Sequence, residues 1–592
     1  MKAILEPAGK RIAVLQIAAL IILGLFIYAP CVRGKFIWDD HGLIKDNTAI
    51  KGWSNLPQLL RTDFGAGSGS SSVYYRPLQT IIHLAGYAVW RENPLGFHLL
   101  SILTHILAAI LFYFLLLYIF HHQVFSFIAS LLFVSFPVNT EAVCYISGLS
   151  DPLVTVFLLL GMIFYLRNLS ITSKRHHFLA LLSFGLALGA KENAVVLPGL
   201  ILLYHYVFKK TVNLRTFLPF LYILIGYGLI RWAVLGAAIP LDLSGSNLWS
   251  RAPVFLAGLT QYGRLLVFPT GLHMEYAYLL SSFGAFRVIL GLAILILILL
   301  AFFSSRDRDP GLSFAAGWFL VAFLPVSNIY PISQALIMEH YLYLPALGFF
   351  ILLAKIFCYP FKQRIARGIL RLAAAGLVIV YAYLTFKQAE RWQDPVIFYQ
   401  QTLKYAPHSW RFYNELGLEY ASSGNPAEAQ TAYQEALKIN PDALGIYANL
   451  IDLYRKTDNR QKLLETEGLV EQVKDKLLKD HLSSARRFQS QGDYQQAVGE
   501  LKQALGLEAG NLLIAQDLAS GYILAGRYRD AVNLLNKILS AKPDFALAYN
   551  NLAVAYYYLK EYDLAVHSCE QALAYGYPVD QEFIKSIALH RK

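Results

Sequence analysis

The chain has 592 residues, of which 56% are hydrophobic and only 15% are charged, whereas a soluble domain usually has about 25% charged residues. Its formal net charge of +12 does not indicate nucleic-acid binding, because Lys and Arg occur in short clusters between apolar runs and form no basic stripe with interleaved aromatic residues. Charged residues are sparse before about residue 390 and frequent after it. We therefore expect an all-α chain with a membrane domain at residues 1–390 and a water-exposed domain after it.

The membrane domain contains eleven apolar stretches close to the length of about 20 residues that crosses a bilayer core about 30 Å thick. The first stretch has no small-residue cleavage site, so we expect it to remain in the protein as an anchor. The stretches lie near residues 11–30, 98–120, 123–138, 152–168, 176–190, 194–208, 216–235, 285–304, 311–326, 341–358 and 367–387.

The distribution of Lys and Arg predicts the orientation. Basic loops such as Lys209–Arg215 and Tyr359–Arg371 alternate with loops that have fewer cations, and loops rich in Lys and Arg stay in the cytoplasm. We therefore expect a cytoplasmic N-terminus and a C-terminal domain on the outer face. A further apolar segment, Arg251–Pro269, would reverse the later loops if it crossed, so we expect it to be a re-entrant or interfacial helix.

The first outer loop contains a pair of adjacent acids. Asp39 and Asp40 follow the first apolar stretch, where charge beside hydrocarbon is usually functional or water-exposed. Transfer of a sugar to a hydroxyl needs a base that removes the hydroxyl proton, and a second acid can raise the pKa of the first or orient it. The pair is therefore the candidate catalytic site, and a solvated pair of loop acids is the alternative.

Other charged side chains expected on the outer face are candidates for binding a sugar donor. A sugar linked to a polyprenyl phosphate leaves a phosphate behind, which needs cations or N–H donors. Each cation taken singly could instead snorkel or pair with an acid at the interface. The candidates are the cations Arg76, Lys191, Arg264 and His340 and the acids Glu141, Asp151 and Glu339.

The cysteines give no sign of a metal site. Cys31, Cys144, Cys358 and Cys569 include no CxxC pair and no metal-ligand spacing. We therefore expect buried or lipid-facing thiols, and their spacing does not reveal the redox compartment.

The C-terminal domain repeats with a period of 34 residues. Its small residues recur at one site of each repeat, where Leu463 marks a degenerate second repeat and the others are Ala429, Ala497, Ala531 and Ala565. A helix–turn–helix unit of 34 residues is the tetratricopeptide signature. The expected segments are a linker at 391–408, a superhelix of five repeats at 409–577 and a capping helix at 578–592.

Superhelices of this kind offer a concave face to extended polypeptides. One position of each first helix is polar in all five repeats, which predicts a groove for an acceptor polypeptide. Simple solvent exposure of these positions is the alternative. The residues are Glu415, Asn449, Ser483, Asp517 and Asn551.

Several motifs resemble those of the transmembrane and tetratricopeptide-repeat O-mannosyltransferases, a family within the polytopic GT-C class of glycosyltransferases. The motifs occur in order along nearly the whole chain. They are FIWDD (36–40), YYRPLQ (74–79), NPLGFHLLSILTHILAAIL (93–111), FPVNTEAVCYISGLSDPL (136–153), AKENAVVLPGL (190–200), QYGRLLVFPTGLHMEY (261–276) and MEHYLYLPALGF (338–349).

The resemblance implies a GT-C fold and an inverting reaction that needs no metal or other cofactor. It implies dolichyl- or undecaprenyl-phosphate mannose as donor, Ser or Thr of a protein as acceptor, and the first-loop acids as catalytic residues, with Asp39 favoured as base over Asp40. The chain is short, has about five repeats and ends without an ER-retention signal. We therefore expect a prokaryotic relative in the plasma (inner) membrane, with the repeats in the periplasm or outside the cell, or in the lumen if the protein is eukaryotic.

Three other functions fit parts of the sequence. A membrane-anchored repeat scaffold explains the repeats but not the outer acid pair. A transporter of lipid-linked intermediates is expected to show inverted repeats among its spans, and none is evident here. A GT-C enzyme acting on a lipid or glycan acceptor remains an alternative to one acting on a protein.

Overall fold

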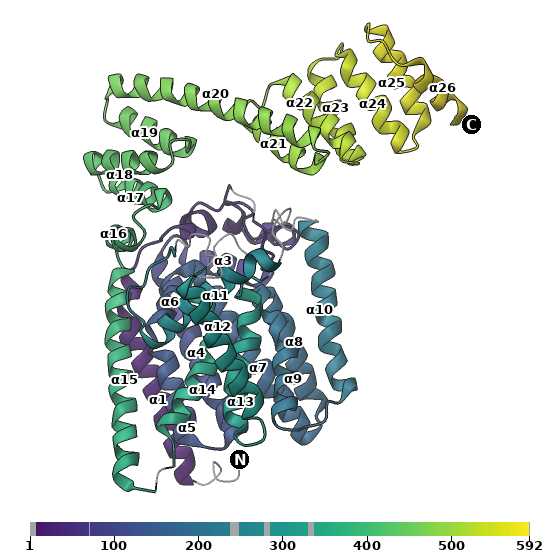
Figure 1. The fold of residues 1–592 in the computed structure, drawn as a ribbon. Helices are drawn as coiled ribbons and strands as arrows, with labels where there is room; N and C mark the ends of the chain where they lie inside the picture. The colour runs from purple at the N-terminus through teal and green to yellow at the C-terminus, as the bar shows by residue number, and fades with distance from the viewer. Residues whose placement is uncertain are drawn as a thin grey trace. The chain divides into compact units, whose positions relative to one another are not determined.

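The computed structural model describes residues 7–69, 72–236, 248–276, 285–329, 337–360 and 362–590, and every element in these ranges is a helix. This confirms the all-α prediction. The chain divides into two compact units, Met1–Glu419 and Tyr420–Lys592 (Figure 1). The predicted linker is mostly helix α16 (Pro395–Tyr405), which belongs to the first unit.

Each of the eleven predicted spans contains a helix. Among the described residues, six helices are long and apolar enough to cross a membrane, and a bent pair of helices makes up to seven. The remaining predicted spans are helices of 11 to 17 residues, shorter than a full crossing requires. The main helices are α1 (Pro7–Tyr28), α4 (Pro94–Phe120), α5 (Gln123–Val134), α7 (Ser150–Ile171), α8 (Lys174–Ala190), α9 (Leu197–Val207), α10 (Leu214–Leu235), α11 (Leu248–Val267), α12 (Phe286–Ser304), α13 (Pro310–Phe323), α14 (Ala346–Phe357) and α15 (Arg364–Arg391).

Loops expected on the cytoplasmic face meet at one end of this unit. The Lys355 ammonium at the end of α14 binds the Asp309 carboxylate at the start of α13, 2.6 Å apart. Arg306, just after α12, donates from Nε to the Tyr206 carbonyl near the end of α9 at 3.1 Å. The end of α14 thus lies beside the start of α13, and the residues after α12 lie beside the end of α9.

Two cysteines tie the opposite end together. Cys31, just after α1, forms a disulfide with Cys144, the last residue of the short helix α6 (Thr140–Cys144), and their Cα atoms are 5.5 Å apart. The expectation of unpaired thiols is therefore wrong for these two residues, because the fold brings together positions 113 residues apart in sequence. Cys358 and Cys569 are free.

Helix α11 packs against α12 and the end of α13. Its Thr260 hydroxyl donates to the Arg287 carbonyl at the start of α12 (2.6 Å). Its Phe255 and Tyr262 rings both lie against Phe323 at the end of α13. Among the described residues, α11 is not one of the six helices that are long and apolar enough to cross a membrane, and its interfacial course stays a prediction.

The second unit is an array of paired helices. The predicted alanine sites Ala429, Ala497, Ala531 and Ala565 are fully buried, which lets the paired helices approach closely. The helices are α18 (Pro426–Ile439), α19 (Leu444–Lys456), α20 (Arg460–Ser490), α21 (Tyr494–Leu507), α22 (Leu512–Leu524), α23 (Tyr528–Ala541), α24 (Ala546–Tyr558), α25 (Tyr562–Ala574) and α26 (Gln581–His590), preceded by α17 (Trp410–Ser422), which crosses the boundary between the units.

Helix α20 departs from the regular pattern. It is 31 residues long and continues from the second repeat into the third without a break (Figure 1). Two other repeat boundaries have a proline, Pro441 and Pro543, and the equivalent position here is Asp475. Because neither Pro nor Gly interrupts the sequence at this boundary, the two helices fuse.

Candidate functional site

The backbone at Trp38 holds the first-loop acids in place. Trp38 has φ 53°, a left-handed conformation that costs a non-glycine residue free energy. Its N–H donates to the Tyr399 hydroxyl (3.1 Å), and its ring packs edge-on against Phe412 at 4.4 Å between centroids. These contacts from α16 and α17 stabilise a conformation that turns the next two side chains in different directions.

Asp40 is buried and fully bonded. Its Oδ2 accepts the Ile37 N–H (3.1 Å), and its Oδ1 accepts the Ser147 N–H (2.8 Å) and hydroxyl (2.5 Å). Burial raises the pKa of Asp40 to about 7, although the Ser147 and Ile37 bonds oppose the shift. Both carboxylate oxygens of Asp40 are therefore hydrogen-bonded to other groups of the protein.

Asp39 differs from its neighbour because its side chain remains exposed. Surrounding protein atoms still displace enough water to raise the pKa of Asp39, and the nearby Tyr145 hydroxyl and Trp38 indole act against that shift. An accessible carboxylate with a raised pKa suits proton removal from a bound hydroxyl. Of the two acids, Asp39 is the one whose side chain remains exposed.

Helix α17 contributes two further acids beside this pair. The His41 imidazole lies 3.6 Å from the Glu419 carboxylate, which raises the pKa of His41. Burial raises the pKa of Glu415, and the Asp39 charge adds to the shift. Glu415 thus lies beside the aspartates, which the groove prediction did not anticipate. The sequence analysis also missed Ser147 and Glu419, which lie far from the acid pair in sequence.

Two of the predicted phosphate-binding cations are already paired. Arg76, before helix α3 (Pro77–Trp90), donates to Glu192 from Nε (3.1 Å) and Nη2 (3.0 Å). The Lys191 ammonium lies 2.7 Å from both oxygens of Asp151. Each buried cation is therefore neutralised by one carboxylate.

The third polar cluster joins Glu141 and Glu339. His340 binds Glu141 through its Nδ1 (2.8 Å) and its backbone N–H (2.9 Å). Glu339 accepts the His273 N–H and the Tyr276 hydroxyl, both at 2.6 Å. Burial and the neighbouring Glu141 charge raise the pKa of Glu339 well above its usual value.

Arg264, also predicted to bind the donor, lies outside these pairs. Its Nε donates to Gln261 (3.3 Å) and its Nη1 to the Thr270 carbonyl (3.1 Å). No salt bridge with a carboxylate forms at Arg264 in the described part of the chain.

One short segment, residues 141–151, connects the three clusters. Glu141 belongs to the glutamate cluster, Asp151 binds Lys191, and Ser147 holds Asp40. The Ser147 carbonyl also accepts Gln79 Nε2 (3.0 Å), one turn into the helix that follows Arg76. Cys144 anchors the segment to α1. Within the described ranges, no three His, Cys, Asp or Glu side chains are placed to hold a metal ion.

Three of the predicted groove positions lie on alternate helices of the second unit. Ser483 is on α20, Asp517 on α22 and Asn551 on α24. Asn551 donates from Nδ2 to the Ser520 hydroxyl of α22 (2.8 Å), and Ser483 donates to the Asp480 carbonyl (2.9 Å). Asn449 is on α19, beyond the long helix.

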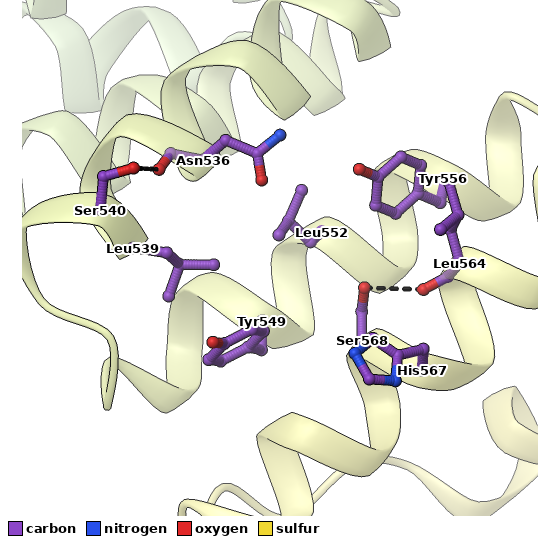
Figure 2. Close-up of a pocket in the computed structure, with 9 residues that line it drawn as sticks. All are labelled: Asn536, Leu539, Ser540, Tyr549, Leu552, Tyr556, Leu564, His567 and Ser568. Atoms are coloured by element: carbon purple, nitrogen blue, oxygen red, sulfur yellow. Dashed lines mark hydrogen bonds between the residues drawn. The ribbon is translucent and has the colours of Figure 1, made fainter.

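The second unit also has a cavity that the sequence did not predict. Its volume is about 500 Å³, and it opens between α23, α24 and α25 (Figure 2). None of the predicted groove residues lines it. The lining residues are Asn536, Leu539, Ser540, Tyr549, Leu552, Tyr556, Leu564, His567 and Ser568.

Family models described as tetratricopeptide repeats match residues 410–443, 488–554 and 545–575, which confirms that the C-terminal part contains tetratricopeptide repeats. The crystal structure of YrrB, described as a TPR protein with an unusual peptide-binding site, is 13% identical and covers 32% of this chain and 97% of that one. Its TM-score of 0.18 is too low for a structural argument.

Relatives that match most of the chain are named protein O-mannosyl-transferases. One from Caenorhabditis elegans is 27% identical over 74% of this chain and 64% of its own length. TMTC3 from Homo sapiens is 22% identical over 87% of this chain and 59% of its own. The chain is thus a homologue of these proteins, as its motifs predicted, and spans about three fifths of their length.

Proposed function

We propose that this protein is a membrane glycosyltransferase that moves a sugar, mannose by analogy with its homologues, from a polyprenyl phosphate to a Ser or Thr hydroxyl of a polypeptide. The observation that carries the proposal is the unequal acid pair, in which Asp40 is buried and fully bonded while Asp39 remains exposed. Homologues named O-mannosyl-transferases support the same reaction class.

In the proposed reaction, Asp39 takes the proton of the acceptor hydroxyl as its oxygen attacks the anomeric carbon of the donor sugar. The bond between that carbon and the phosphate oxygen breaks, and polyprenyl phosphate leaves with the electron pair. A single displacement inverts the anomeric centre. Asp40 positions the loop and, as a neighbouring negative charge, favours the protonated form of Asp39. We expect the reaction to need no metal or other cofactor.

We further propose that the acid pair faces the outer side of a plasma membrane, with the N-terminus in the cytoplasm. The disulfide between Cys31 and Cys144 lies at the same end as the aspartates, and disulfides persist in oxidising compartments. The basic loops at the opposite end support the same orientation. The repeat array would then present acceptor polypeptides on the outer side.

A transfer assay tests the proposal. Purified protein receives radiolabelled polyprenyl-phosphate mannose and Ser/Thr-containing polypeptides, and Asp39→Asn should abolish transfer. Asp46→Asn, which changes an exposed acid of the same loop, is the matched control and should retain it. Full transfer by the folded Asp39→Asn variant would overturn the assignment of the base.

A further inference from the structure

Helix α10 has one charge within its apolar length. The helix runs from Leu214 to Leu235 and is a candidate membrane span that the rest of the protein hardly covers. Its only ionisable groups besides tyrosine are Arg215, in the first turn, and Arg231, one turn from the other end. An arginine at such a position is costly unless it reaches water, a partner or a ligand.

Arg231 lies against the loop that precedes α3. Its Nη2 donates to the Val73 carbonyl at 3.2 Å, and one turn earlier Tyr227 donates its hydroxyl to the Tyr75 carbonyl, also at 3.2 Å. The Tyr227 hydroxyl is within electrostatic reach of Arg76, Arg231 and Glu192. Arg231 therefore lies near the Arg76–Glu192 pair of the candidate site.

The charges of this region do not balance. Arg76 is neutralised by Glu192 and Lys191 by Asp151, but no carboxylate pairs with Arg231 among the residues that the structure describes. Its Nε is shielded from solvent and has no hydrogen-bond partner there. Among the described residues, the Arg231 charge thus has no compensating carboxylate, and its Nε–H donor is unused in a place where water does not satisfy it.

We propose that Arg231 binds the phosphate of the polyprenyl-linked sugar donor, an inference that rests on the proposed function. A guanidinium that donates one N–H to a carbonyl still has N–H donors for a phosphate, and Arg readily forms bidentate hydrogen bonds with phosphate oxygens. The phosphate would supply the missing negative charge. Arg76 and Lys191, which the sequence predicted for this role, remain paired with Glu192 and Asp151.

The surroundings fit a lipid-linked phosphate. Tyr222, Ile225, Leu229 and Trp232 on α10 expose apolar surface, along which a polyprenyl chain can lie. On the other side, Arg76 leads into α3, where Gln79 contacts the Ser147 carbonyl and Ser147 holds Asp40. Arg231 is thus linked to Asp40 by a series of contacts, through the loop before α3, Gln79 and Ser147.

Direct lipid binding tests the inference without relying on catalysis. Purified full-length protein in detergent is titrated with undecaprenyl phosphate, undecaprenol and phosphatidylglycerol, with binding followed by native mass spectrometry. Arg231→Gln should weaken undecaprenyl phosphate binding at least about tenfold and leave undecaprenol unchanged, and Arg231→Lys should lose less. The control is Arg215→Gln on the same helix, which should bind like the wild type.

Three results would overturn the inference: equal phosphate binding by a folded Arg231→Gln variant, an equal loss of undecaprenol binding, or equally tight binding of phosphatidylglycerol. In transfer assays, Arg231→Gln should raise the donor KM more than it lowers kcat. Arg231-dependent binding without any sugar transfer would refute the proposed function alone. Transfer that is indifferent to Arg231→Gln would refute this inference alone.

Discussion

Removing the Ser147 hydroxyl should shift the pH profile of the enzyme. Ser147 donates to Asp40 Oδ1 through its hydroxyl and its N–H, and Ser147→Ala removes only the first bond. A hydrogen bond to a charged group contributes about 1.5–3 kcal/mol, equivalent to about 1–2 pKa units. Because the bond favours ionised Asp40, its loss raises the Asp40 pKa from about 7 to about 8–9.

The expected loss of activity depends on pH. At pH 7 the ionised fraction of Asp40 would fall from about one half to about 1–10%. If the reaction uses the ionised pair, kcat/KM at pH 7 should fall about 5- to 50-fold and recover as the pH rises above 9. Asp39 and His41 face the same loop, so the acid limb belongs to the coupled group and not to one residue.

The assay is kcat/KM for sugar transfer between pH 5 and pH 10, with thermal unfolding as a check on folding. Ser54→Ala, at an exposed serine of the same loop, is the control and should follow the wild-type profile. A Ser147→Ala profile that superimposes on the wild type would refute the reasoning. So would an equal loss at every pH, because that result indicates a displaced loop instead of a shifted titration.

Two further predictions concern stability. The double variant Cys31→Ser, Cys144→Ser opens a loop of 113 residues, which by chain entropy costs up to about 4.8 kcal/mol of stability. Its thermal midpoint should fall well below that of the control variant Cys358→Ser. Equal midpoints would contradict a closed disulfide. In the repeats, Gly526 has φ 73°, so Gly526→Ala should destabilise by about 1–2 kcal/mol. Gly468→Ala, inside α20 with open space around it, should stabilise the protein by up to about 1 kcal/mol. Denaturant unfolding should therefore show changes in unfolding free energy of opposite sign for the two glycine variants. Changes of the same sign would contradict the backbone argument.

The features that the sequence predicted correctly depend on spacing and composition within short stretches of the chain. The 34-residue spacing predicts the buried alanines because helix pairing needs a small residue at a fixed place in every repeat. The apolar stretches likewise predict where helices form, because each of the eleven contains one.

What the sequence missed depends on contacts between distant segments. The disulfide joins residues 113 positions apart, and nothing near either cysteine marks its partner. Glu415 fits the groove pattern by spacing, but it lies beside Asp39 because α16 brings the start of α17 back to the first loop. The sequence analysis did not single out Arg231, because its position depends on contacts between α10 and the loop before α3.

The length of the uninterrupted helix α20 limits how an acceptor polypeptide could bind to the repeats. At about 1.5 Å per residue, its 31 residues extend over about 46 Å, the first half in the second repeat and the second half in the third. An extended polypeptide needs about 14 residues to cover that length. If the repeats bind acceptor polypeptides as proposed, a short acceptor could contact the repeats at only one end of α20. A longer unfolded segment could contact the repeats at both ends, which would favour modification of polypeptides before they fold.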